Sequence, residues 1–263
     1  MTPRTPLFLL VPALLMTGCK HAPAPAAPTA TVSTPAAGPA PPIAPPTDPA
    51  TAGSIIGTVR FNGPAPARIP IDMSADPACN KSDLPNLTEQ LIVTDGLLAN
   101  VYLYIKSGAP SYNASPTAVP ITLDQNRCRY SPHVIAIQQG GSVAFLNSDS
   151  TIHNIHTLPT QPGNASVDIS EPAGSAPRTQ AFPTPEVMLP VRCNNHPWMS
   201  AFINVAPNPW FAVTGTEGAF TITGLPPGTY TLAAVHEKLG EQDIQITINP
   251  KSVATASFTF STK

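Results

Sequence analysis

One short segment of the chain combines three side chains that bind soft or borderline metal ions. Cys193, His196 and Met199 supply a thiol, an imidazole and a thioether within seven consecutive residues. A mononuclear blue-copper centre uses one cysteine and two histidines in a trigonal plane, with a weak axial methionine. The segment therefore contains three of the four ligands, and a second histidine must come from elsewhere.

Two histidines compete for the fourth position. His153 lies forty residues before Cys193, and His156 follows it by three residues. Side chains three residues apart on a strand point to opposite faces of a sheet. Both histidines therefore cannot easily reach one metal ion, and their spacing alone does not choose between them.

The two segments together resemble those of the cupredoxins, the blue-copper proteins of the amicyanin and plastocyanin type. The amicyanin loop has the pattern Cys-x-x-His-Pro-aromatic-Met, and its first ligand opens a His-Asn-x-His run. The resemblance implies one type 1 copper that alternates between Cu(II) and Cu(I), held by His153, Cys193, His196 and Met199. It also implies that Asn154 braces the ligand loop and that His196 is the solvent-exposed electron port.

Other uses of these residues make different demands. A structural zinc site favours more than one cysteine and does not recruit methionine. A thiol nucleophile would use Cys193 with His196 as its base and no metal. A cuproenzyme of the nitrite-reductase kind needs a second copper, and the remaining histidines show no matching spacing. We therefore expect electron transfer rather than an enzyme, with copper storage or delivery as the alternative.

The fold class follows from short apolar runs beyond residue 54. These runs are rich in β-branched and aromatic residues and are bounded by Gly, Pro, Asn or Asp. No long helical period occurs, so the chain is predicted to be all-β and built as sandwiches. The expected strands cover residues 55–61, 99–105, 134–138, 142–146, 201–205, 219–222, 230–235 and 244–248.

The first and last runs resemble the carboxypeptidase regulatory-like, or transthyretin-like, β-sandwich. Gly57-Thr58-Val59 matches the Gly-x-Val pattern of its first strand, and residues 99–103 resemble a middle strand. Because the copper-like motifs lie between these matches, we expect a cupredoxin Greek-key sandwich of residues 110–207. It would be inserted in, or lie next to, a transthyretin-like sandwich of residues 54–109 and 208–263.

Two turns in the C-terminal stretch are expected to close hairpins. They are Glu217-Gly218 and Pro226-Pro227-Gly228, whose residue types are typical of tight turns. Phe220, Ile222 and Tyr230 alternate with polar residues around them, as strands with one buried face require.

The N-terminus reads as an export signal. The apolar run 7–16 is too short to span a bilayer and ends at Thr17-Gly18-Cys19. This ending resembles a bacterial lipoprotein signal, which implies that residues 1–18 are removed and Cys19 is acylated. An ordinary secretory signal is the alternative. We expect a membrane-anchored protein of the cell envelope that faces the periplasm or the cell surface.

Residues 19–53 are expected to form a disordered tether. This stretch is rich in Pro and Ala, with ten prolines between Pro23 and Pro49, and such segments are extended and semi-rigid. The whole chain carries a net charge of -2 and only 11% charged residues. Without a basic stripe, nucleic acid is not an expected partner, and we expect redox proteins instead.

The two remaining cysteines, Cys79 and Cys128, are predicted to form a disulfide. An exported protein meets an oxidising compartment, and Cys19 and Cys193 already have roles. The bridge is expected to tie the start of the inserted sandwich to the outer one. Two buried free thiols are the alternative.

Overall fold

The computed structural model describes residues 47–80, 85–112 and 115–262. The regular secondary structure in these ranges consists of β-strands alone, which confirms the predicted all-β class. Among the same residues, no helix is long and apolar enough to cross a membrane. The predicted signal peptide of residues 1–18, the acylated Cys19 and most of the tether 19–53 lie outside the described part.

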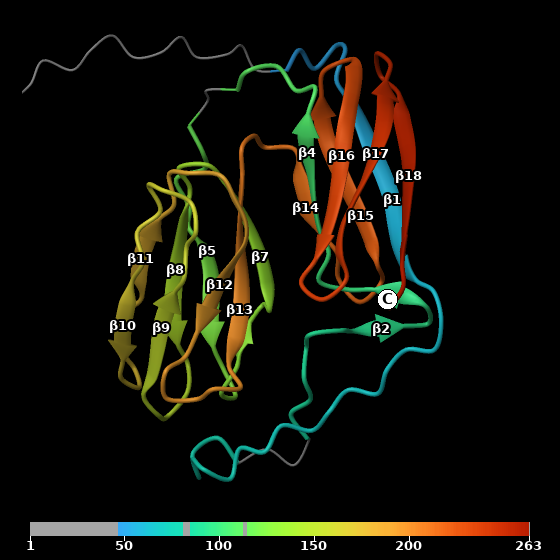
Figure 1. Ribbon diagram of the computed structural model, residues 1–263. Coiled ribbons are helices and arrows are strands. Elements are labelled where there is room, and N and C mark those ends of the chain that lie inside the picture. Colours follow the sequence, from blue (N-terminus) through green and yellow to red (C-terminus); the bar gives the residue numbers. More distant parts are fainter. Residues whose placement is uncertain (1–46, 81–84, 113–114, 263) are drawn as a thin grey trace, which may run out of the picture. The chain divides into compact units, whose positions relative to one another are not determined.

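One pair of sheets takes strands from both ends of the described chain (Figure 1). We call this pair the outer sandwich. Its five-stranded sheet contains β1 (Gly53–Phe61), β2 (Val93–Thr94), β3 (Leu97–Leu98), β15 (Ala219–Leu225) and β18 (Val253–Phe260). Its four-stranded sheet contains β4 (Tyr102–Ser107), β14 (Phe211–Val213), β16 (Gly228–His236) and β17 (Gly240–Ile248). The chain therefore leaves this sandwich after β4 and returns to it at β14.

The outer sandwich is held together by apolar side chains from both of its sheets. Alternate residues of β1 and β18, such as Val59 and Phe258, pack with Leu103 of β4 and Leu232 of β16. All four are almost fully buried. The alternation that predicted strands in the sequence thus corresponds to the inward-facing positions.

The two predicted hairpins are wrong. Glu217-Gly218 connects β14 to β15, and Pro226-Pro227 connects β15 to β16, but these strands belong to different sheets. Both turns therefore cross between the layers. Tight turns have the same residue types in hairpins and in crossings, so only the strand partners distinguish the two. The β16–β17 connection is a true hairpin, in which residues 228–236 pair with residues 240–248.

The second pair of sheets, which we call the inserted sandwich, holds the candidate ligands. Its five-stranded sheet has the order β10 (Asp168–Glu171), β9 (His153–Thr157), β12 (Glu186–Arg192), β13 (Ser200–Ala206) and β7 (Val134–Gln138). Its four-stranded sheet has the order β11 (Arg178–Ala181), β8 (Ser142–Asn147), β5 (Ile121–Gln125) and β6 (Tyr130–Ser131). Because β12 and β13 are antiparallel neighbours, residues 193–199 form the loop at one end of this sandwich.

The long connection between β1 and β2 belongs to the inserted sandwich by its packing. Met73 and Cys79 are buried in that sandwich's core, and Cys79 forms a disulfide with Cys128, which follows β5. We expected residues 54–109 to belong to the outer sandwich and the disulfide to tie the two sandwiches together. Both sulfur atoms instead lie in one core, since the connection leaves the outer sheet after Phe61 and packs elsewhere.

The first strand contains a glycine that tolerates no side chain. A Cβ atom on Gly57 would lie 2.0 Å from the backbone oxygen of Ala256 and 2.6 Å from the ring of Phe220. Gly57→Ala is therefore expected to lower the free energy of unfolding by about 1–3 kcal/mol through overpacking, measured by denaturant titration. Ile56→Ala, at a position that is 43% exposed, is the control. An unchanged midpoint for Gly57→Ala would show that β1 and β18 do not pair as described.

The disulfide should contribute strongly to stability. The bridge links residues 49 positions apart, so it restricts the unfolded chain considerably. Replacing both Cys79 and Cys128 with Ser should lower the free energy of unfolding by about 2–5 kcal/mol. The comparison is with the parent protein in the same denaturant series, without a reducing agent. Equal stability of the two proteins would contradict this role of the bridge.

Candidate metal centre

Three potential ligand atoms from distant parts of the chain meet inside the inserted sandwich. The side chains of His153, Cys193 and His196 each place one donor atom within 4.8 Å of the others. The two Nδ1 atoms of the histidines are 3.0 Å apart, and Cys193 Sγ is 3.6 Å from His196 Nδ1. All three residues are buried, with exposures of 0%, 4% and 4% in that order.

The β12–β13 hairpin positions two of these side chains. Its last paired residues are Arg192 and Ser200, so the seven residues between them form the ligand loop. Inside the loop, the N–H of Met199 donates to the carbonyl of His196 (2.9 Å), and the N–H of Cys193 donates to the carbonyl of Met199 (3.4 Å). These bonds fold the loop back on itself and hold Cys193 and His196 close together.

The register of β9 brings the third side chain to the same place. His156 lies opposite Arg192 in the β9–β12 pair, so the residues before His156 run alongside the ligand loop. There the N–H of Asn194 donates to Asn154 Oδ1 (3.2 Å), the kind of bracing contact expected for Asn154. His153, at the start of β9, faces the donor atoms.

His156 points away from the cluster. Its Nδ1 lies 3.0 Å from Asn194 Oδ1, and its side chain is only half-buried. Residues 153 and 156 thus occupy opposite faces of β9, as the strand period requires. The structure places His153, and not His156, with Cys193 and His196.

Met199 is the fourth residue of the predicted ligand set. It is 1% exposed and packs in the same apolar core as Cys193. Thioether sulfur is a weak ligand that also packs well among apolar groups. Met199 therefore shares a core with Cys193 and is the thioether that the predicted ligand set requires.

Each candidate ligand histidine has a carboxylate on its outer nitrogen. His153 Nε2 is 2.9 Å from Asp149 Oδ2, and His196 Nε2 is 2.9 Å from Asp76 Oδ2. A carboxylate that accepts the Nε2 proton leaves the Nδ1 lone pair free for a metal and fixes the ring. Sequence reasoning missed both residues. Asp149 precedes His153 by four positions and could have been noticed, whereas nothing marks Asp76 as a partner of His196.

The cluster favours a thiolate. Burial by itself would raise the pKa of Cys193, but hydrogen bonds from His153, from His196 and from the backbone N–H of Asn195 lower that pKa to about 7. Burial would also lower the pKa of His153, yet Asp149 and Cys193 raise it to about 9. Each group therefore stabilises the charged form of its neighbour.

Tyr130 contacts β9 next to the cluster and was not singled out in the sequence. Its hydroxyl donates to the backbone carbonyl of Asn154. Burial, followed by the nearby Cys193 and Glu171, raises the pKa of Tyr130 well above its ordinary value. The phenol therefore stays neutral, and its hydroxyl can donate steadily to β9.

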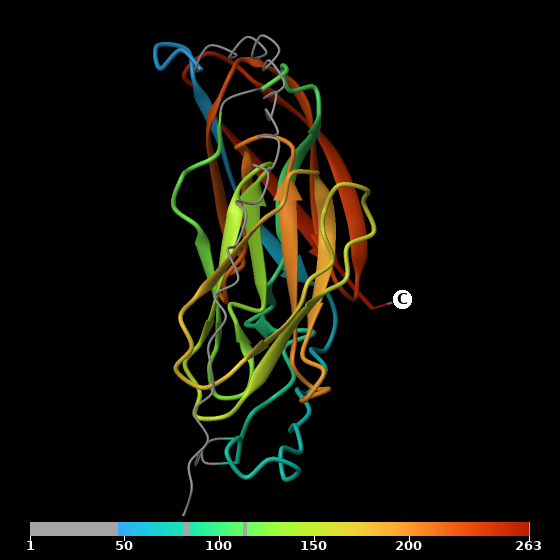
Figure 2. The same ribbon diagram turned by 90° about the vertical axis from the view of Figure 1, so that its left-hand side faces the viewer.

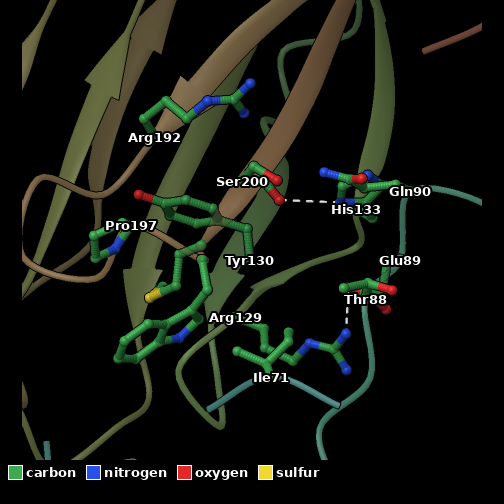
Figure 3. Close-up of a pocket in the computed structure, with 12 residues that line it drawn as sticks. Ile71, Thr88, Glu89, Gln90, Arg129, Tyr130, His133, Arg192, Pro197 and Ser200 are labelled. Carbon is green, nitrogen blue, oxygen red and sulfur yellow. Dashed lines mark hydrogen bonds and ion pairs between the residues drawn. The ribbon is translucent and has the colours of Figure 1, made fainter. Parts of the chain in front are cut away.

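The expectation that the His196 side chain is exposed to solvent is wrong. His196 is 4% exposed, because Asp76 and Cys79 lie against its outer nitrogen, with Cys79 Sγ at 3.7 Å. Residues of the β1–β2 connection, of the β6 region and of the ligand loop also line one pocket, seen in Figure 3 with Ile71, Arg129, Tyr130, Pro197 and Ser200 labelled. The connection thus lies beside the ligand loop at this pocket and at His196.

The donor set fits a metal ion. The distances of 3.0 and 3.6 Å between donor atoms are short enough for one ion to contact them together, since bonds from an ion such as Zn²⁺ to nitrogen and sulfur are about 2.0–2.3 Å long. Two imidazoles and one thiolate, with a methionine in the same core, match the ligand types of blue-copper sites.

No protein-family model matches the chain, and no curated protein matches it. Among solved structures, the chain is similar to the copper-containing nitrite reductase from Thermus scotoductus SA-01, with 20% identity, a TM-score of 0.31 and coverage of 38% of this chain and 25% of that chain.

The chain is also similar to an amicyanin variant in its Cu(I) form, with 19% identity and a TM-score of 0.29. For a reduced amicyanin variant, the identity is 18% and the TM-score is 0.30. Each amicyanin comparison covers 39% of this chain and 97% of the other. The chain thus spans a quarter of the reductase and nearly all of amicyanin. These neighbours are cupredoxins, and what this chain binds is inferred from its own donor atoms.

Proposed function

We propose that this chain is an exported type 1 copper protein that transfers electrons. The observation that carries the proposal is the buried set of His153, Cys193 and His196, whose donor atoms lie within 4.8 Å of one another, with Met199 in the same core as Cys193. His153, Cys193 and His196 would hold the copper strongly and Met199 weakly. Bound there, copper would supply a one-electron couple between Cu(II) and Cu(I).

The residues around the donors keep the site rigid. The ligand loop is closed by its own backbone hydrogen bonds, and Asp76 and Asp149 restrain the two imidazoles. Such packing leaves the donor atoms little freedom to move. A site that does not rearrange between two charge states has a small reorganisation cost, which suits electron transfer better than binding and release of a cargo ion.

An enzyme with a second, catalytic metal is the less favoured class. Within the described ranges, each group of three potential ligand residues shares His153 or His196 with this one centre. Two of the groups also rely on Cys79 or Cys128, which are joined in the disulfide. We therefore propose an electron carrier, with protein redox partners on both sides of the transfer.

The proposed location follows from the N-terminal sequence. A lipid on Cys19 would anchor the chain to a membrane of the cell envelope, and the proline-rich tether of residues 19–53 would carry the copper centre away from the surface. Incorporation of a labelled fatty acid in a bacterial host that processes lipoproteins is the direct test. Loss of the label in Cys19→Ser supports acylation, and an unlabelled parent chain contradicts it.

Copper loading tests the proposed function. The purified protein with one equivalent of Cu(II) should become intensely blue or green through charge transfer from the Cys193 thiolate, with narrow hyperfine splitting in electron paramagnetic resonance. Cys193→Ser should abolish the colour, and His153→Ala should weaken or remove it. His156→Ala is the matched control, because that ring points away from the donors, and its spectrum should match that of the parent.

Two results would contradict the proposal. A colourless copper complex with ordinary hyperfine splitting would favour storage or delivery of copper over electron transfer. Loss of the colour in His156→Ala, with the colour kept in His153→Ala, would show that the ligands are assigned to the wrong histidine.

The copper-free protein should show an unusually acidic thiol. The pKa of Cys193 is lowered to about 7, from an ordinary value of about 8.5, so thiolate absorbance at 240 nm should rise with a midpoint near pH 7. A lowered pKa stabilises the folded state above the unfolded value, and this contribution is lost as the pH falls through 7. His153→Ala should move the midpoint upward, and Cys193→Ser provides the blank. A midpoint at or above 8.5 in the parent protein would contradict this assignment.

A further inference from the structure

The β1–β2 connection brings an acidic residue to the outer side of the metal centre. We call residues 69–79 the cover segment. Its Asp76 contacts His196 Nε2 at 2.9 Å and accepts a hydrogen bond from the hydroxyl of Thr151 at 3.0 Å. The other oxygen of Asp76 accepts the N–H of Ala78 at 2.8 Å. Both oxygens are thus engaged, so the carboxylate has a defined orientation toward the ring.

The cover segment is anchored in the structure. The disulfide joins its last residue, Cys79, to Cys128, and Met73 packs in the core of the inserted sandwich. Backbone hydrogen bonds also tie it to the chain that follows, with Ile71 N–H donating to Asn86 (2.8 Å) and Thr88 N–H donating to Ile69 (2.9 Å). Figures 1 and 2 both show the connection beside the end of the inserted sandwich that carries the ligand loop.

The disulfide itself borders both ligand histidines. Cys79 Sγ lies 3.7 Å from His196 Nε2, and the sulfur of Cys128 lies within 4.8 Å of a ring nitrogen of His153. The N–H of Cys128 donates to Asp149 Oδ2 at 2.7 Å, the same oxygen that contacts His153. One bridge therefore holds together the two carboxylate–histidine pairs.

We propose that Asp76 is a positioning residue for the ligand His196 and that the disulfide-anchored cover segment closes the His196 edge of the metal centre. This inference rests on the proposed function, since it concerns the second histidine of that centre, which is 4% exposed. Asp149 lies four positions from its partner His153 in the chain, whereas Asp76 lies 120 positions from its partner His196. The centre is complete only when the cover segment is in place.

The chemistry of the contact sets the direction of its effect. A carboxylate that accepts the Nε2 proton makes the ring a stronger donor at Nδ1 and keeps it in the right tautomer, and loss of such a partner typically reduces metal affinity about 10–100-fold. A stronger donor favours Cu(II) over Cu(I). Removing the charge of Asp76 should therefore weaken copper binding and raise the reduction potential.

Asp76→Asn is the sharpest variant. Asparagine keeps the Oδ1 acceptor for the N–H of Ala78, but its NH₂ group cannot accept the proton of His196 Nε2. We expect Cu(II) affinity to fall about 10–100-fold and the reduction potential to shift upward. The control is Asp72→Asn in the same cover segment, where the carboxylate accepts the N–H of Ser74 at 2.9 Å and is exposed. It should match the parent in both measurements.

A second measurement needs no metal. In the copper-free protein, the rate at which diethyl pyrocarbonate modifies His196, followed by mass spectrometry of the peptide, reports how well the ring is covered. The double variant Cys79→Ser, Cys128→Ser should speed this reaction several-fold, because it releases the end of the cover segment. Asp76→Asn should speed it less, since the disulfide remains.

The outcomes separate this inference from the proposed function. If the parent protein forms no coloured copper complex, the function fails, and the cover is still judged by the modification rate of His196. The inference fails and the function stands if the parent is coloured, Asp76→Asn retains the parent's copper affinity and reduction potential, and the double variant leaves the modification rate of His196 unchanged. Weaker binding, a raised potential and faster modification together support it.

Discussion

The antiparallel pairing of β9 with β12, and of β12 with β13, is the constraint on which the centre depends. These three strands place the start of β9 beside the loop that joins β12 to β13. A shift of one residue in the β9 register would turn His153 away from the core and bring a neighbour to its place. Ile155 and Thr157, which are buried on the same face as His153, oppose such a shift, so the core packing also sets the positions of the donor atoms.

Burial of the donors creates a problem that the surrounding residues solve. Imidazole and thiol groups in an apolar core lose contact with water, and unsatisfied polar atoms there are costly. Asp149 and Asp76 satisfy the outer nitrogens, and both carboxylates are themselves held by hydrogen bonds. His153 and Cys193 satisfy each other, which explains why their pKa values move in opposite directions. The same contacts that make burial tolerable therefore prepare the site to bind a cation.

The nested topology has a structural consequence for the centre. The outer sandwich sends out two connections, one of which becomes the whole inserted sandwich, whereas the other runs between β1 and β2 and returns. This second connection packs Met73 and Cys79 into the inserted core. A third apolar cluster contains residues of both sandwiches, among them Tyr102 and Ala233 from the outer one and Ala206 from the inserted one. The outer sandwich thus supports the inserted one, and its β1–β2 connection also supplies part of the surroundings of the candidate metal centre.

Much of the fold was readable from local patterns. Residues 134–138 form β7 as expected, and the expected strand of residues 230–235 lies inside β16, because period-two alternation reflects burial of one face. Strands such as β9 and β12 were not recognised, since histidines and Pro190 interrupt their apolar pattern. The hairpins at Glu217 and Pro226 were wrong because a turn's residue types describe its bend and say nothing about which strands pair afterwards.

The sequence by itself determined the candidate donor types, the short loop that carries three of them, and the two cysteines that form a disulfide. Such features depend on residue identity and near spacing. Only the tertiary structure decided that His196 is covered, that Asp76 and Asp149 hold the two rings, and that the disulfide borders them both. These contacts join residues as far as 120 positions apart. Their partners are chosen by the packing of whole sheets, which leaves no local mark on the chain.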